Sequence, residues 1–358
     1  MTIFLLYVIS PVIVAIFIRV LTNRSLSDEK SKDYCILING IVMALMIGLR
    51  HYGNGSSDSR FYFDVWQNIS EMDFFEFFQY AKEIDMEKGF LFYNFVATRI
   101  FKNPQFAFVF SGIFFSVSTS MFVKKNCKDV VLPFVIFNSL GLFNFMVQGM
   151  RQAFAMCICL YAYELAKKKK IIGFTVVVAL ATTFHASAVV FAVAFAMRFL
   201  KCNIHSIIVF VAGSVVGTNI LPKIFELLNK LMNEEYGISE VPVGSSRIIT
   251  IMIHLVIILF GLVLYKFGNE RNDYAPFIYM AILGTTMFYL STSANAIVER
   301  IAFYFMFAQM AIVSNALYNV RDKKIKLILS MSIIGLFFCL AIHKASYSSL
   351  IPYKFMWS

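Results

Sequence analysis

The sequence predicts an all-α fold, a polytopic bundle of transmembrane helices that forms a single membrane domain over residues 1–358. The chain is 59% hydrophobic and only 15% charged, and its mean hydropathy is +0.73. A soluble domain usually has about 25% charged residues, so this chain lacks the polar surface to cover a globule. Apolar segments fill the sequence and, at about 20 residues per span, leave no room for a large soluble domain.

About twelve spans are expected, and they follow one another along the whole chain. They lie at 2–20, 34–50, 104–123, 130–147, 152–166, 171–184, 187–200, 206–221, 248–266, 274–292, 301–320 and 326–343. The first has no basic residue before it and no small-residue cleavage site, so we expect a retained span and not a signal peptide.

The distribution of charge predicts the orientation. With the N-terminus outside, six short inner connections hold 19 of the 32 Lys and Arg residues and eight of the 21 acids, so this side carries the entire net charge of +11. Lys167 to Lys170 form the densest basic run. This is the positive-inside pattern, which attributes the basic composition to the bilayer and its anionic lipids and excludes a nucleic-acid partner. Both termini are then predicted to lie outside.

Two outer segments are long enough to contain structure of their own. In 51–103, Phe74, Phe75, Phe77 and Phe78 share one face of a helix, which predicts an amphipathic helix in the membrane interface. The apolar stretch that follows, Glu87 to Phe101, is too short for a comfortable span and is expected to be re-entrant or interfacial. The segment 222–246 has apolar residues at helical spacing and predicts a second surface helix.

Charged residues at the outer ends of spans are the first candidates for function, because a charge inside a bilayer costs from about 3 to over 10 kcal/mol. All of them map to one side of the membrane and are suited to lining one outward-facing cavity. They are Arg50, Arg151 with Gln152, His185, Arg247, and Glu299 with Arg300. Headgroup snorkelling by each arginine is the alternative interpretation.

Arg151 is the most informative of these residues. It begins a helix, where free N–H groups and the positive end of the dipole favour an anion, and its guanidinium adds a bidentate fork for phosphate. The start of this span is therefore predicted to hold a diphosphate.

His185 is the best candidate for a general base, because an unperturbed imidazole titrates near pH 6.5 and accepts a hydroxyl proton at neutral pH. Asp58 and Glu87 are outer carboxylates suited to orienting sugar hydroxyls, binding a cation or acting as the base. A structural histidine in a hydrophobic hairpin is the competing interpretation of His185. No metal-binding motif, phosphate-cradling glycine loop or nucleophile elbow is present, so neither a metal nor a cofactor is expected.

The order of these motifs resembles the EpsG-like exopolysaccharide polymerases, which are functional relatives of the Wzy polymerases. The resemblance covers nearly the whole chain. It rests on Gly48-Leu49-Arg50, Ser57-Asp58 with Tyr62, Glu87-Lys88-Gly89-Phe90, Arg151-Gln152-Ala153, Phe184-His185-Ala186-Ser187, Arg300 with Tyr304, and Ile351-Pro352-Tyr353-Lys354-Phe355.

The resemblance implies a membrane glycosyltransferase that joins undecaprenyl-diphosphate-linked oligosaccharides at the outer face of the bacterial cytoplasmic (inner) membrane, with a chain-length regulator among its partners. Arg151 and Arg300 are then expected at the diphosphates and Arg50 at a third contact. His185 is expected as the base. Three aromatic residues are expected either to stack on sugars or to anchor the protein in the membrane interface. They are Tyr62, Trp66 and Tyr304.

Three other functions are compatible with the same hydropathy profile. A flippase or transporter of lipid-linked saccharides would use the same arginines, but prolines here lie mainly at span ends and in loops, which disfavours broken transport helices. A membrane O-acyltransferase also pairs histidine with arginine, although its donor usually arrives from the cytoplasm. A structural partner in an export complex leaves no sequence sign.

Overall fold

The computed structural model describes residues 1–23, 25, 28–54, 57–232, 245–267, 271–290, 296–346, 348 and 350–357. It confirms the all-α fold, since the described residues contain helices and no β-strand. The first helices are α1 Thr2–Thr22, α2 Glu29–Gly48, α3 Ser57–Glu71, α4 Phe74–Glu83, α5 Lys88–Ile100, α6 Gln105–Asn126, α7 Leu132–Ser139, α8 Leu142–Gln148 and α9 Met150–Lys167. The others are α10 Ile171–Thr182, the 3₁₀ helix η1 Ala186–Ala192, α11 Val193–Met197, α12 Ile204–Met232, α13 Ser245–Phe267, α14 Arg271–Leu290, α15 Ala296–Tyr318 and α16 Lys323–Ala345.

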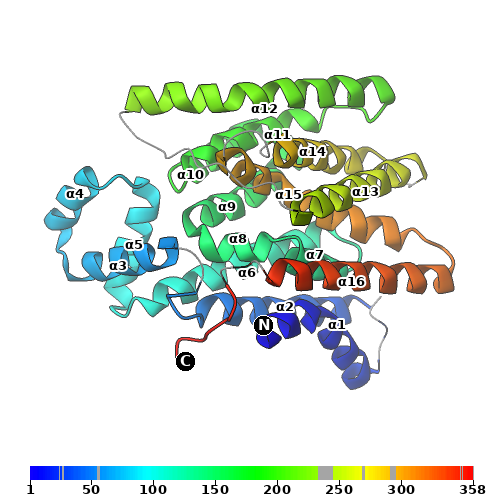
Figure 1. The fold of residues 1–358 in the computed structure, drawn as a ribbon, viewed down its shortest axis with the longest axis horizontal. Helices are drawn as coiled ribbons and strands as arrows, with labels where there is room; N and C mark the ends of the chain where they lie inside the picture. The colour runs from blue at the N-terminus through cyan, green and yellow to red at the C-terminus, as the bar shows by residue number, and fades with distance from the viewer. Residues whose placement is uncertain are drawn as a thin grey trace.

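The helices form a stack in which α9 and α15 lie near the middle (Figure 1). Helices α1, α2 and α6 pack together on one side, and α12 lies on the opposite side against α14. Helices α3, α4 and α5 form a lobe at one end of the stack. Helix α9 contacts α6, α8, α10, α11, α15 and η1, so its start and its end are both surrounded by other elements.

The apolar faces of the outer helices identify a membrane protein. Among the described residues, five helices are long and apolar enough to cross a bilayer, namely 2–22, 29–48, 105–126, 298–318 and 323–345. Shorter apolar helices lie at 171–182, 186–197, 204–220, 248–263 and 274–290. Large hydrophobic side chains on these helices stay exposed, among them Ile16, Val209 and Ile328. A soluble protein would bury such faces, whereas a bilayer solvates them.

Two of the expected spans are not continuous helices. The span expected over 130–147 divides into α7 and α8 at Leu140 and Gly141, where Gly141 has a φ of 100° that a side chain would oppose. The span expected over 187–200 begins as the 3₁₀ helix η1 and becomes α-helical only at Val193. Both irregular segments lie next to the residues that the sequence singled out.

The outer segment 51–103 contains α3, α4 and α5. Helix α4 begins with a capping box in which Asp73 accepts from Phe75 and Glu76 and the Glu76 carboxylate accepts from Asp73. Of the phenylalanines expected to share a face, Phe77 is buried and stacks on Phe95, whereas Phe74, Phe75 and Phe78 stay exposed. These exposed rings are suited to the membrane interface.

The second outer segment differs from the expectation of a separate helix. Helix α12 continues without a break to Met232, so the apolar positions from 224 to 232 extend a span. The rest of this segment, 233–244, and the side chain of Arg247 lie outside the described residues.

The C-terminal segment folds back onto the C-terminal end of α2. The His51 N–H donates to the Lys354 carbonyl at 3.0 Å, the Met356 N–H donates to the Leu49 carbonyl at 2.8 Å, and Asn54 bonds both to the N–H and to the carbonyl of Lys354. These contacts join two motifs that lie 300 residues apart in the chain and close the structure over Arg50.

Candidate functional site

A carboxylate from the α3–α5 lobe connects the two most prominent sequence candidates. One carboxylate oxygen of Glu87 lies 2.5 Å from Nη1 of Arg151, and the other lies 2.5 Å from Nδ1 of His185. Glu87 caps the start of α5, Arg151 is the second residue of α9, and His185 precedes η1. The side chains are 11%, 22% and 17% exposed, so the cluster is shielded but reachable from outside the protein.

Glu87 is ionised over the whole physiological pH range. Burial alone would raise its pKa, but the hydrogen bond to His185 and the charges of His185 and Arg151 outweigh burial and lower the pKa from 4.5 to about 2. An ionised carboxylate only accepts hydrogen bonds, so Nδ1 of His185 carries the proton in this pair. In the neutral imidazole, Nε2 is then the acceptor.

A glycine holds Glu87 against the histidine. The N–H of Gly89 donates to the carbonyl of Thr183 at 2.9 Å, two residues before His185. A Cβ at Gly89 would lie 2.7 Å from the Thr183 carbonyl oxygen and would also collide with the Thr183 side chain. The close approach of α5 to the end of α10 therefore depends on glycine at this position.

The N-terminal parts of α9, α15 and η1 are connected by polar contacts. Gln152 donates from Nε2 to the carbonyl of Arg300 at 2.7 Å, and the hydroxyls of Ser187 and Tyr304 lie 3.1 Å apart. The Tyr62 hydroxyl lies within hydrogen-bonding reach of Arg151, and burial raises the pKa of Tyr62, so this phenol stays protonated. These contacts restrict the orientations of the side chains around Arg151.

An aromatic layer supports the cluster from within the membrane. Phe154, one turn after Arg151, contacts five rings from two helices and the α10–η1 turn at centroid distances of 4.6–6.0 Å. Its partners are Phe90 and Tyr93 of α5, Phe114 and Phe115 of α6, and Phe184. Such packing restrains side chains more tightly than solvent does, so the charged groups above it have a defined geometry.

A cavity of about 460 Å³ contains two further sequence candidates, Asp58 and Arg300. It lies at the breaks between α7, α8 and α9 and is also lined by Gln148, Glu299 and Lys344. Lys344 donates from Nζ to the Leu140 carbonyl at 3.1 Å, which is a carbonyl exposed by the end of α7. Carboxylates and cations that face one hollow are suited to a sugar bearing a phosphate.

Arg50 lies inside the protein and not in this cavity. It is completely buried, its guanidinium stacks on Phe108 at 4.3 Å from the ring centre, and Nη2 lies 3.3 Å from the sulfur of Met150. Nε and Nη1 have no hydrogen-bond partner among the described residues. Arg50 therefore adds positive charge directly behind Arg151 without a path to solvent for a direct diphosphate contact.

The aromatic candidates are also interior residues. Tyr62 is 4% exposed, Trp66 is 0% exposed and Tyr304 is 2% exposed. Trp66 packs with Ala97 and Ala107, and Tyr304 bonds to Ser187. These rings present no face to a sugar in this conformation, because neighbouring helices already cover them.

Sequence reasoning missed Lys344 and the role of Gly89. Lys344 is in the last turn of α16. The charge pattern predicts this end of the helix on the outer side, where it disfavours a lysine, and that exception was a usable signal. The Gly89 contact joins segments about 95 residues apart, which spacing alone does not reveal. Within the described residues, no three His, Cys, Asp or Glu side chains form a group that would hold a metal ion.

The fold and site define a class: a multi-pass α-helical membrane protein with a histidine, a carboxylate and a guanidinium joined at the ends of its helices. The chain belongs to the EpsG family, whose family model matches residues 33–355. This confirms the resemblance and indicates a polysaccharide polymerase-like function of the glycosyltransferase type. A search of curated proteins and a search of solved structures each found no match.

We expect Gly89→Ala to reduce polymer formation by about 10–100-fold while leaving the protein in the membrane. The added methyl group pushes α5 away from Thr183, and a displacement of about 1 Å at a reacting group is enough for losses of this size. Polymer can be measured in the host strain that carries each variant. Gly335→Ala is the matched control, because nothing lies within 4 Å of that position. Equal polymer from both variants would disprove the positioning role of Gly89.

The low pKa of Glu87 predicts a pH-dependent contribution to stability. Because the folded pKa of about 2 is below 4.5, wild type should be more stable than Glu87→Gln by a constant margin above about pH 5. The margin should shrink as the pH falls from 4.5, with roughly half lost near pH 3. Thermal unfolding of both proteins in detergent across this range measures it, and a margin that grows on acidification would contradict the assignment.

Proposed function

We propose that the protein is a surface-polysaccharide polymerase that joins oligosaccharide repeat units carried on undecaprenyl diphosphate at the outer face of a bacterial cytoplasmic membrane. One observation carries the proposal: Glu87 bridges His185 and Arg151. A base for a sugar hydroxyl and a cation for a diphosphate are thereby held on one carboxylate. Both are groups that glycosyl transfer from a lipid diphosphate requires.

His185 acts as the general base in this scheme. Its Nδ1–H is held by ionised Glu87, and its Nε2 accepts the proton of the acceptor hydroxyl. The hydroxyl oxygen forms a bond to the anomeric carbon of the donor sugar while the bond from that carbon to the diphosphate oxygen breaks. The bonding electrons leave with the diphosphate, and Glu87 stabilises the imidazolium that forms. Glu87 is thus a positioning residue, and it replaces His185 as the base only if His185 proves dispensable.

The arginines act on the leaving group. Negative charge on the diphosphate grows as the glycosidic bond breaks, so cations placed there bind the transition state more tightly than the ground state. Arg151 stands at the start of α9, where the helix dipole also favours an anion. Arg300 lines the neighbouring cavity, Arg50 contributes charge from behind, and Gln152 fixes the backbone at Arg300.

The cavity of about 460 Å³ is the proposed sugar subsite. Asp58 on α3 and Lys344 both line this cavity. In the proposed scheme Asp58 accepts hydrogen bonds from sugar hydroxyls and Lys344 donates to the sugar. In this scheme both termini lie outside the cytoplasmic membrane, a chain-length regulator is a further partner, and neither a cofactor nor a nucleic acid takes part.

Deleting the gene in its host should leave single repeat units attached to the lipid acceptor and remove the ladder of longer chains. A flippase mutant would instead show undecorated acceptor, and an acyltransferase mutant would keep the ladder but lose acyl groups. Gel analysis of lipid-linked and finished glycans separates these outcomes, so a persistent ladder excludes the polymerase.

In the deletion strain, His185→Ala should restore about 10²–10⁴-fold less polymer per protein than wild type, the usual loss when a general base is removed. His205→Ala is the matched control, since His205 is exposed at the start of α12, far along the chain from the cluster. Quantifying the ladder against the membrane level of each protein gives the comparison. Wild-type output from His185→Ala would transfer the role of base to Asp58 or Glu87.

Arg151→Ala should abolish the ladder without removing the protein from the membrane, because both the diphosphate and Glu87 lose their cation. Arg151→Lys should recover only part of the activity, since lysine keeps the charge but lacks the bidentate fork. Arg60→Ala, an exposed arginine on α3, is the control for loss of one outer charge. An intact ladder in Arg151→Ala would exclude Arg151 from the site.

A further inference from the structure

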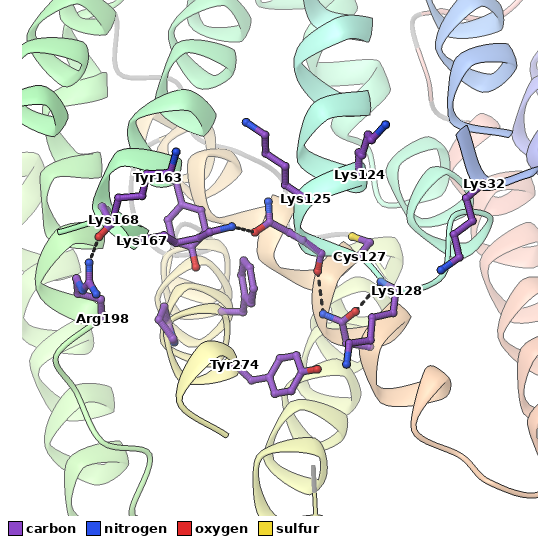
Figure 2. Close-up of a pocket in the computed structure, with 15 residues that line it drawn as sticks. Lys32, Lys124, Lys125, Cys127, Lys128, Tyr163, Lys167, Lys168, Arg198 and Tyr274 are labelled. Atoms are coloured by element: carbon purple, nitrogen blue, oxygen red, sulfur yellow. Dashed lines mark hydrogen bonds between the residues drawn. The ribbon is translucent and has the colours of Figure 1, made fainter. Parts of the chain in front are cut away.

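A second cavity, of about 630 Å³, lies at the opposite ends of the helices that carry the candidate site. Arg151 and Lys167 are at the two ends of α9, and at 1.5 Å per residue the sixteen steps between them span about 24 Å. Figure 2 shows the basic side chains around this inner cavity. It is lined by Lys32, Lys124, Lys125, Lys128, Lys167, Lys168 and Arg198, with Tyr163, Tyr274 and Phe277 among its uncharged residues.

The cations of the inner cavity come from separate parts of the chain. Lys32 is in the first turn of α2, Lys125 is in the last turn of α6, Lys168 follows α9 and Arg198 follows α11. The positive-inside rule requires only that such residues lie on one side of the membrane. It does not require them to surround one hollow, where they repel each other, so their convergence needs a further explanation.

Hydrogen bonds preorganise this rim. Lys167 donates to Asn126 at 2.8 Å and to Glu164 at 3.0 Å. Asn315 donates to the Asn126 carbonyl at 2.9 Å and accepts from the Lys128 N–H at 2.8 Å (Figure 2). Arg198 donates to the Ala166 carbonyl. The connections that bear the cations are thus held in place by hydrogen bonds within the chain.

The positive charge of the inner cavity is only partly compensated. Asp33 pairs with Lys124 at 2.8 Å and Glu164 pairs with Lys167. Among the described residues, no carboxylate lies within ion-pair distance of Lys125 or Lys168. Tyr163 and Phe277 are buried and give the cavity an apolar floor below this charged rim.

We propose that the inner cavity binds a phosphate-bearing anion on the side of the protein opposite the polymerase site. Lysine ammonium groups bind phosphate oxygens through charge-assisted hydrogen bonds, and several lysines around one pocket match a group with more than one negative oxygen. An apolar floor and a basic rim at helix ends suit the head group of an anionic phospholipid, and a soluble phosphate ester offers the same chemistry. The inference is independent of the proposed reaction.

The test measures thermal unfolding of the full-length protein in a neutral detergent, with and without each of two probes. Phosphatidylglycerol is added against an equal mole fraction of phosphatidylcholine, and inorganic pyrophosphate is added at constant ionic strength. Wild type should gain on the order of 2–5 °C from one of the probes. The double variant Lys125→Ala/Lys168→Ala should lose at least half of that gain; both side chains are exposed, so the variant is expected to fold.

Lys323→Ala/Lys324→Ala is the matched control, because it removes two lysines from the same side of the membrane outside the cavity. A gain from phosphatidylglycerol that is lost only in the cavity variant assigns a lipid ligand, and the same result with pyrophosphate assigns a soluble one. No gain with either probe, or equal losses in the two double variants, would overturn the proposal. Pyrophosphate bound at Arg151 would persist in the cavity variant and is therefore distinguishable.

Discussion

The ionised carboxylate of Glu87 is the contact on which the candidate site depends. A charge removed from water at the membrane surface is stable only if an opposite charge and hydrogen bonds replace the lost solvation. Glu87 meets this condition with Arg151 on one oxygen and His185 on the other. Because removal of one partner from a buried pair costs about 3–5 kcal/mol, all three side chains are constrained to stay together. The same constraint joins α5, α9 and the α10–η1 turn at a single point.

This arrangement gives each group a different part of the chemistry. The carboxylate fixes the tautomer of His185 by taking its Nδ1–H, so the other ring nitrogen is available for a proton. The guanidinium of Arg151 offers several donors, and its Nη1 lies 2.5 Å from the Glu87 carboxylate. In the proposed reaction, the proton acceptor and the anion site are thus separated by only one carboxylate.

The sequence was sufficient for the class of fold and for the neighbourhood of the site. Positive-inside counting placed Arg151, His185 and Arg300 on one side, and the structure brings Arg151 to His185 through Glu87. Hydrophobic periodicity did not predict the contacts between residues far apart in the chain. Two of these are Gly89 with Thr183 and Lys344 with Leu140. The sequence also did not predict which motif residues are buried. Nothing in the sequence around Arg50 indicates that the C-terminal segment will cover it.

The breaks in the helices explain why a polar cavity is tolerated at this depth. Irregular backbone inside a membrane leaves carbonyl and N–H groups without intrahelical partners, which is costly unless they line a cavity or meet another polar group. The end of α7 leaves the Leu140 carbonyl to Lys344, and the start of α9 after Gly149 leaves its first N–H groups beside Arg151. A continuous helix over 130–166 would have satisfied the backbone and removed both features. The interruptions at Gly141 and Gly149 therefore free backbone carbonyl and N–H groups beside the cavity, at the cost of a less regular bundle.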